Sequence, residues 1–234
     1  MGKPTFAVID ADVGLYELEK VVASGWCFRA LAQRLVGGGS LLVSPVRGTM
    51  TGSAASLEAV GAPAFALAPN HFHYMGLAET INHYPEVRAI ASGVALRRLR
   101  SKCPHDLDGL DAVRERLPAG VSLLEPPGLK TGEVWLRFES ERGVGWVVSD
   151  AFFNVNRALS GTMGLVLRAT ATAPGLRIGS TFLWLALADR QAYKRWLLAR
   201  LEADAPRLLI PSHGDVVVDD DLPARLRELA RRRL

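Results

Sequence analysis

Three stretches of the sequence place a side chain that can bind a metal ion directly after an apolar segment. His71 and His73 follow "PAFALAPN", Asp150 follows "GVGWVVS" and His213 follows "RLLIPS". Imidazoles and carboxylates are ligands for Zn and Fe, and a mononuclear catalytic site needs three protein ligands. A carboxylate is costly inside a sheet but is natural at its rim. Because α/β folds place their sites at the carboxyl ends of strands, we expect these side chains to converge there.

The two neighbouring histidines have a second interpretation. His71 and His73 can both face one ion from a loop while Phe72 faces the core. They also suit the polar start of a helix, which needs no metal. Met75 offers only a weak thioether and Gly76 offers no ligand, so the next positions do not extend the site.

Composition describes an ordinary globular protein. The chain has 234 residues, of which 49% are apolar, enough for a sizeable core. The net charge is +4, and the basic run "LPARLRELARRRL" has the helical spacing of a solvated helix face. Cys27 and Cys103 lack ligand-like spacing. No signal peptide or membrane span is recognisable, so we expect a cytoplasmic protein whose partner is a small-molecule substrate, not a nucleic acid or a membrane.

Apolar periodicity predicts alternating strands and helices. The glycines at 37–39 predict a hairpin between strands 28–36 and 40–46. We treat residues 151–180 as a long loop with a piece of helix. The remaining prediction is helix 51–60 capped by Ser53 or Thr51, strand 63–68, helix 75–84, strand 87–92, helix 94–102, strands within 120–127, 132–140 and 143–150, helix 189–202, strand 207–211 and a terminal helix. This order implies sheet layers covered by helices, an α/β or α+β fold.

The order of these stretches resembles the metallo-β-lactamase fold superfamily. Its signature is a strand with Thr-His-x-His-x-Asp-His, then Gly-His-x-x-Gly, an Asp after a strand, and a final strand with Gly-His-Gly. "APNHFHYMG", "PPGLKTGEV", "VVSDAFFN" and "LLIPSHGD" match it in order, and "GGGSLLVSPV" is similar to the first hairpin of a divergent branch. The resemblance covers residues 26–225 and implies one domain over 1–234, with the four-layer αβ/βα sandwich of this superfamily.

The resemblance assigns ligand roles to the four residues. His71 and His73 match the first two histidines, Asp150 matches the bridging and catalytic carboxylate, and His213 matches the last histidine. In the family's geometry these four would hold at most one ion of Zn or Fe.

The same match shows which residues of the signature this chain lacks. Met75 and Gly76 occupy the places of the Asp and His that hold the second metal, and Leu129 stands where the third histidine of the first metal is expected. The resemblance therefore implies a degenerate site, either with one ion or with none.

Three polar residues near these motifs are further candidates for ligand binding. Asn70 and Asn154 can hydrogen-bond a ligand or cap a turn. Lys130 can replace the lost ion beside Asp150 or point into water.

Two functions follow from the sequence. One is a metal-dependent hydrolase of a small ester, thioester or lactone with a reduced metal site. The other is a non-catalytic descendant of the fold that binds a ligand or a partner.

Overall fold

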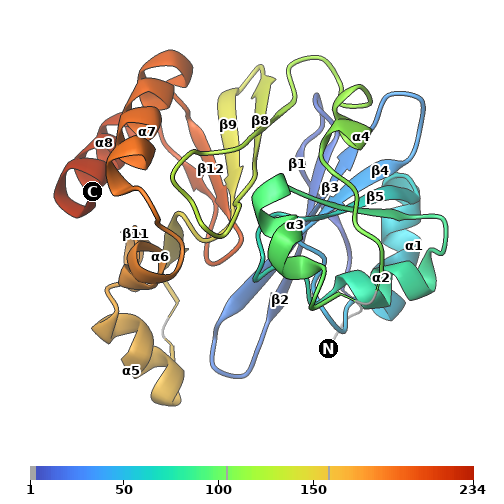
Figure 1. Cartoon of the computed structure of the whole chain (residues 1–234), viewed down its shortest axis with the longest axis horizontal. Helices are drawn as coiled ribbons and strands as arrows, with labels where there is room; N and C mark the ends of the chain where they lie inside the picture. The colour runs from blue at the N-terminus through green and yellow to red at the C-terminus, as the bar shows by residue number, and fades with distance from the viewer. Residues whose placement is uncertain (1–3, 104, 158) are drawn as a thin grey trace.

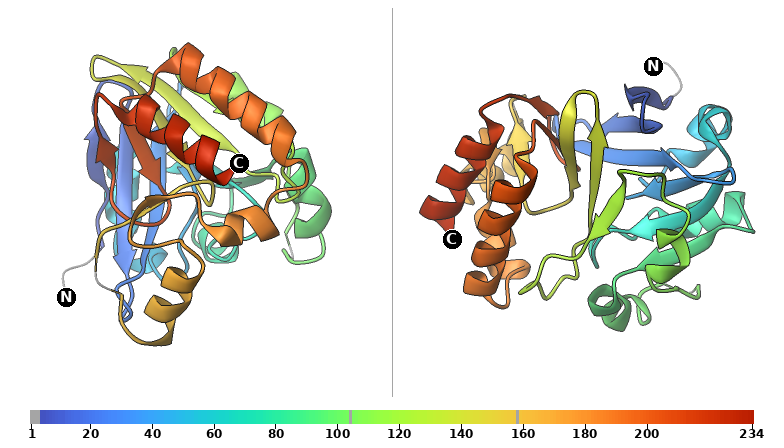
Figure 2. Two further views of the ribbon diagram at one scale, coloured as in Figure 1. Left: turned by 90° about the vertical axis from the view of Figure 1, so that its left-hand side faces the viewer. Right: turned by 90° about the horizontal axis from the view of Figure 1, so that it is seen from above.

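The chain forms two β-sheets that face each other, with helices on the outer side of each sheet. The computed structural model describes residues 4–103, 105–157 and 159–234. Seen from above, helices α7 (Arg190–Asp204) and α8 (Leu222–Arg233), drawn in orange and red, lie on one side of the strands, and helix α1 (Met50–Val60), drawn in cyan, lies on the other side (Figure 2). The α/β class and the four-layer sandwich expected from the sequence are confirmed.

The first sheet has six strands in the order β1-β2-β3-β4-β5-β6. Its strands are β1 (Ala7–Asp10), β2 (Leu15–Val21), β3 (Cys27–Arg34), β4 (Ser40–Val43), β5 (Pro63–Ala68) and β6 (Arg88–Ala91). The first four strands run antiparallel to their neighbours, whereas β4, β5 and β6 are parallel.

The second sheet has five strands in the order β13-β12-β9-β8-β7, and β10 pairs with β11 separately. These strands are β7 (Ser122–Leu124), β8 (Trp135–Ser140), β9 (Gly143–Val148), β10 (Phe153–Val155), β11 (Gly175–Arg177), β12 (Leu208–Pro211) and β13 (Val217–Val218). Strands β9 and β12 are parallel neighbours, so their carboxyl ends lie at the same edge of the sheet.

Helices cover both outer faces of the sandwich (Figure 1). They are α1 (Met50–Val60), α2 (Leu77–His83), α3 (Gly93–Leu99), α4 (Asp111–Arg114), α5 (Gly161–Ala169), α6 (Ser180–Leu185), α7 (Arg190–Asp204) and α8 (Leu222–Arg233). Helices α1, α2 and α3 pack on the first sheet, and α6, α7 and α8 pack on the second. Among the described residues, no helix is long and apolar enough to span a membrane.

Alternation along the strands divides the core into layers. In β9, Trp146 and Val148 pack against the helices of the second sheet, whereas Val147 packs between the sheets. In β5, Phe65 also lies between the sheets. Neighbouring side chains on a strand point to opposite faces of the sheet. Each of these strands therefore contributes buried residues both to the space between the sheets and to the layer under the helices.

Most predicted elements are present, and the hairpin between β3 and β4 is confirmed. The cap prediction for α1 is wrong, because the N-cap is Thr49 and its side chain makes no capping bond. Strands β1 and β2 were not predicted from the sequence. The region 151–180, expected to be a long loop with a piece of helix, contains α5 but also the strands β10 and β11. In β2, Leu15 and Leu18 are buried at a spacing of three, so the two-residue signal is absent.

Candidate metal centre

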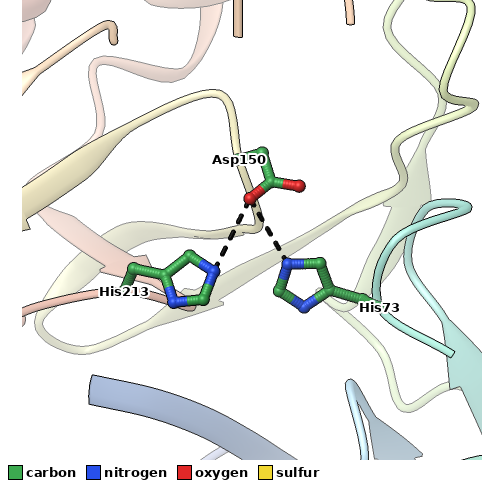
Figure 3. Close-up of side chains that lie close together, drawn as sticks. All are labelled: His73, Asp150 and His213. Carbon is green, nitrogen blue, oxygen red and sulfur yellow. Dashed lines mark hydrogen bonds and ion pairs between the residues drawn. The ribbon is translucent and has the colours of Figure 1, made fainter. Parts of the chain in front are cut away.

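Two imidazoles and one carboxylate converge where three strands end (Figure 3). Nε2 of His73 lies 3.3 Å from Oδ1 of Asp150, and Nε2 of His213 lies 3.6 Å from the same oxygen. One ligand atom from each residue lies within 4.8 Å of the others. His73 follows β5, Asp150 follows β9 and His213 follows β12. The parallel strands of the two sheets thus deliver all three side chains to one place.

The Asp150 carboxylate is fixed from two directions. The side-chain amide of the buried Asn70 donates to Oδ2 of Asp150 at 2.7 Å. Behind the site, the Glu133 carboxylate accepts the backbone N–H groups of Ser149, Asp150 and Ala151 at 3.0, 3.2 and 3.3 Å. Oδ1 of Asp150 therefore points toward the two imidazoles.

Local hydrogen bonds also orient His73. Oδ1 of Asn70 accepts the backbone N–H groups of Phe72 and His73 at 2.8 and 3.1 Å, which closes an Asx turn directly after β5. On the other side of the ring, Nδ1 of His73 lies 2.8 Å from Oγ of Ser44. Ser44 is buried at the end of β4 with φ of 53°. This left-handed conformation is uncommon for a serine and turns the chain toward the site.

His213 is held in an aromatic cage. Its Nδ1–H donates to the carbonyl oxygen of Cys27 at 2.8 Å, which leaves Nε2 facing Asp150. The rings of Trp26 and Phe153 stack on the imidazole with centroids 4.7 and 5.8 Å away, and Phe28 packs edge-on at 5.6 Å. The cage fixes the ring and excludes water from it.

Charge coupling determines the protonation of His73 and Asp150. Burial opposes protonation of His73, but the charge and hydrogen bond of Asp150, with the charge of Glu133, outweigh burial and raise the pKa of His73. Burial also opposes ionisation of Asp150, but the charge of His73 and the contacts of both histidines hold the pKa of Asp150 well below its usual range. Without an ion, the protonated imidazole and the ionised carboxylate therefore stabilise each other.

Glu133 is a second carboxylate in the same buried region. Burial first, and then the charge of Asp150, raise the pKa of Glu133 to about 7, against the opposing effect of its hydrogen-bond donors. One of those donors is the indole N–H of Trp135, at 2.9 Å. Because its oxygens accept bonds from the turn that carries Asp150, Glu133 positions that turn and is not itself aimed at the cluster.

The chemistry of the donor set fits one metal ion. Each imidazole has its Nδ1 engaged, in one ring by Ser44 and in the other by the Cys27 carbonyl. The Cys27 carbonyl can only accept, so it fixes the tautomer of His213 that leaves the Nε2 lone pair free for a metal. The Ser44 hydroxyl can accept the Nδ1–H of His73, and Nε2 of His73 is then free in the same way. Two Nε2 atoms and one carboxylate oxygen form a donor set that suits Zn or Fe and leaves a coordination position open.

The three residues border an apolar cavity of about 380 Å³. Its lining residues include Trp26, Phe28, Val46, Phe72, Met75, Phe153, Phe182 and Leu185. Cavities of this size and character bind small molecules, with a few polar groups providing orientation.

His71 is not part of the cluster, although the sequence suggested it as a ligand beside His73. Its side chain is buried, its ring packs edge-on against Phe72 with centroids 4.3 Å apart, and it does not line the cavity. Burial first, and then the charge of Arg98, lower the pKa of His71 and keep the ring neutral. The structure thus brings together three of the four suggested ligands.

The other candidate residues have local partners. Asn70 hydrogen-bonds the Asp150 carboxylate and closes the Asx turn, so it positions other residues of the site. Asn154 donates to the Asp215 carbonyl at 2.9 Å and joins β10 to the loop that carries His213. Nζ of Lys130 donates to the Trp184 carbonyl at 2.8 Å, so Lys130 does not pair with Asp150 in this structure.

Other residues stand at the positions where the signature has its remaining ligands, Met75 and Gly76 for the second metal and Leu129 for the first. Met75 is 58% exposed at the rim of the cavity, and Leu129 is buried in the core. A Cβ atom at Gly76 would lie 2.0 Å from the carbonyl oxygen of Pro45, so no histidine fits there without a shift of the backbone.

Two residues that support the centre, Glu133 and Ser44, were not predicted from the sequence. Glu133 lies two residues before the apolar strand β8. The pattern that pointed to Asp150, a carboxylate beside a buried strand, therefore applies to Glu133 as well. Ser44 has no comparable signal of its own, because its role depends on its position in space beside His73.

Comparison with solved structures gives whole-chain similarity at low identity. A metallo-beta-lactamase from Pontibacter korlensis is 12% identical with a TM-score of 0.65, over 97% of this chain and 99% of that chain. The metallo-beta-lactamase FIM-1 from Pseudomonas aeruginosa, solved in a mono-zinc form, is 15% identical with a TM-score of 0.62, over 98% of this chain and 95% of that chain.

A third similar structure is that of a di-iron protein. A flavo di-iron protein from Thermotoga maritima is 14% identical with a TM-score of 0.56, and the match covers 99% of this chain and 62% of that chain. No family model and no curated protein matches the sequence. At these identities the likeness establishes the fold and not the activity.

Metal affinity should depend on pH through His73. Because the pKa of His73 is raised above 6.5, a proton competes with the metal for Nε2 already near neutral pH. Below that pKa, zinc affinity should fall by about tenfold for each unit of pH. Competition with a chromophoric chelator from pH 5.5 to 8.5 measures this dependence, and an affinity that is flat over the range would contradict it.

Gly76 should tolerate no side chain. Gly76→Ala places a methyl group against the Pro45 carbonyl, and we expect it to destabilise the fold by roughly 2–3 kcal/mol. For a chain of this size, that lowers Tm by about 5–10 °C. Gly93→Ala is the matched control, because a Cβ at Gly93 meets nothing within 4 Å. Equal melting temperatures for the two variants would show that the close approach at Gly76 is absent in solution.

Proposed function

We propose that this chain, which has the metallo-β-lactamase fold, is a hydrolase of a small ester, thioester or lactone that uses one metal ion held by His73, Asp150 and His213. The observation that supports this proposal best is the convergence of two Nε2 atoms and Oδ1 of Asp150 beside an apolar cavity. Zinc and iron are the candidate ions, because the ligands are two imidazoles and a carboxylate.

A bound Zn or Fe ion would supply a Lewis acid for the substrate carbonyl and a nucleophile at neutral pH. The residues of the chain prepare the site for this chemistry. Ser44 and the Cys27 carbonyl fix the two imidazoles, and Asn70 and Glu133 fix the carboxylate. The aromatic walls bind the apolar part of the substrate and exclude water.

The substituted positions limit the expected rate. With Met75 and Gly76 in place of an Asp and a His, the loop after β5 offers no second carboxylate to orient a nucleophile. Loss of a general-base interaction commonly reduces a rate by about 10²- to 10⁴-fold. We therefore propose slow turnover of activated substrates.

Binding without turnover is the second candidate function. It is favoured by the loss of the second metal position, where Gly76 lies against the Pro45 backbone. In that case the cavity and the imidazole pair bind a small molecule that the protein does not hydrolyse.

Metal content and esterase activity test the first proposal together. Protein purified without an affinity tag should contain about one equivalent of Zn or Fe and should hydrolyse p-nitrophenyl esters or thioesters slowly. His73→Gln and His213→Gln should lose both properties. His71→Gln is the matched control, because His71 lies outside the cluster and should leave metal content unchanged.

The outcomes separate the two functions. Metal binding without any metal-dependent hydrolysis would favour the binding function. Absence of metal binding in folded wild-type protein at pH 8, or metal loss in His71→Gln with retention in His213→Gln, would contradict the proposed centre. Thermal unfolding of each variant shows whether a loss reflects the site or the fold.

A further inference from the structure

We propose that the molecule bound in this cavity consists of an apolar body and an anionic group, and that Lys20 and Arg47 bind the anionic group at the cavity mouth. This inference rests on the proposed function in that it names the class of substrate, but it concerns binding and needs no turnover.

The lining of the cavity is mostly apolar, and its charged residues are few. Its walls come from the hairpin between β2 and β3, the loop after β5, β10 and α6, and most of them are apolar. A cavity of about 380 Å³ holds roughly a dozen water-sized groups, which suits a body of six to ten carbons.

The charged lining residues form two groups at different depths. The side chains of His73, Asp150 and His213 are mostly shielded from solvent, with exposures of 11, 19 and 7%, and their charges compensate one another. Lys20 is half-buried and Arg47 is exposed, so they lie nearer to solvent. A ligand that extends from the metal centre to the mouth therefore meets positive charge at its outer end.

Among the residues that the structure describes, neither of the two cations at the mouth forms an ion pair. Across residues 4–103, 105–157 and 159–234, no carboxylate lies within 4.0 Å of the charged nitrogens of Lys20 or Arg47. Two adjacent unpaired cations attract an anion and disfavour a cationic ligand.

The loop that carries Arg47 is held in place at several points. Nζ of Lys20 donates to the Arg47 carbonyl at 2.6 Å, which ties the end of β2 to this loop. The Glu79 carboxylate accepts the backbone N–H groups of Gly48 and Met50. Glu79 is thereby occupied with the backbone of the loop. The Lys20 ammonium is consequently fixed at the mouth and keeps donors free for a ligand.

This anchoring also links the mouth to the metal centre. The same loop begins at Ser44, whose Oγ contacts Nδ1 of His73. At Gly48, with φ of 75°, a Cβ would lie 3.0 Å from Nζ of Lys20, so the glycine leaves room for the ammonium group. The cations therefore have a defined position relative to the reactive atoms, as recognition of a ligand's outer end requires.

Carboxylate and phosphate groups share the chemistry that this mouth recognises. Both accept hydrogen bonds from ammonium and guanidinium groups, and such charge-assisted bonds are stronger than neutral ones. Attached to an apolar body, either group gives an amphiphilic anion whose apolar part fills the cavity.

Calorimetric titration of metal-free protein tests this proposal with four eight-carbon probes. Octanoate, octyl phosphate, octanol and octylamine share an apolar body and differ in head group. At low ionic strength, octanoate or octyl phosphate should bind at least about tenfold more tightly than octanol, and octylamine should bind most weakly. Comparison of the two anions distinguishes a carboxylate ligand from a phosphate ligand.

Variants assign the selectivity to the two cations. The double variant Lys20→Met with Arg47→Met should lose the preference for anions and keep the affinity for octanol. Lys194→Met with Arg195→Met on α7 is the matched control, because these residues do not line the cavity. The single variant Arg47→Met tests the same point at an exposed position where folding is not at risk.

Two results would overturn the proposal. Equal affinity of wild-type protein for octanoate, octyl phosphate and octanol would show that no anion site exists. Anion preference that persists in the double variant would place the anion on the histidines instead. Because no turnover is measured, selective binding in a protein without esterase activity would refute the proposed hydrolase and leave this inference standing.

Discussion

The candidate site depends on one buried carboxylate between two imidazoles. Burial alone would favour the neutral acid, so Asp150 stays ionised only because His73 and His213 lie against it. The hydrogen bonds from Asn70 to the carboxylate and from the turn to Glu133 keep Oδ1 in place. A metal ion can replace the proton in this arrangement, since an ion between the same atoms compensates the same negative charge.

The fold explains why the centre suits one ion and not two. The loop after β5 approaches the loop after β4 so closely that Gly76 lies against the Pro45 backbone. The same approach brings Ser44 within hydrogen-bond distance of His73. The close approach of these two loops therefore excludes a histidine for a second metal at Gly76 and also orients His73 toward the first.

Much of the architecture follows from local sequence, whereas the membership of the site does not. Short apolar segments predicted β5 and β9, because a strand inside the sandwich packs against a layer on each of its faces. The position of Asp150 and His213 after strands indicated that they lie at the sheet edge. Spacing alone could not distinguish His71 from His73, since the choice depends on how the Asn70 side chain turns the loop.

Anomalous diffraction from a crystal soaked in a zinc salt tests the central claim most directly. The proposed centre requires a single strong zinc peak about 2.0–2.2 Å from Nε2 of His73, Nε2 of His213 and Oδ1 of Asp150. A strong peak bound by His71 without His213, or no peak beside Asp150 at pH 8, would contradict it.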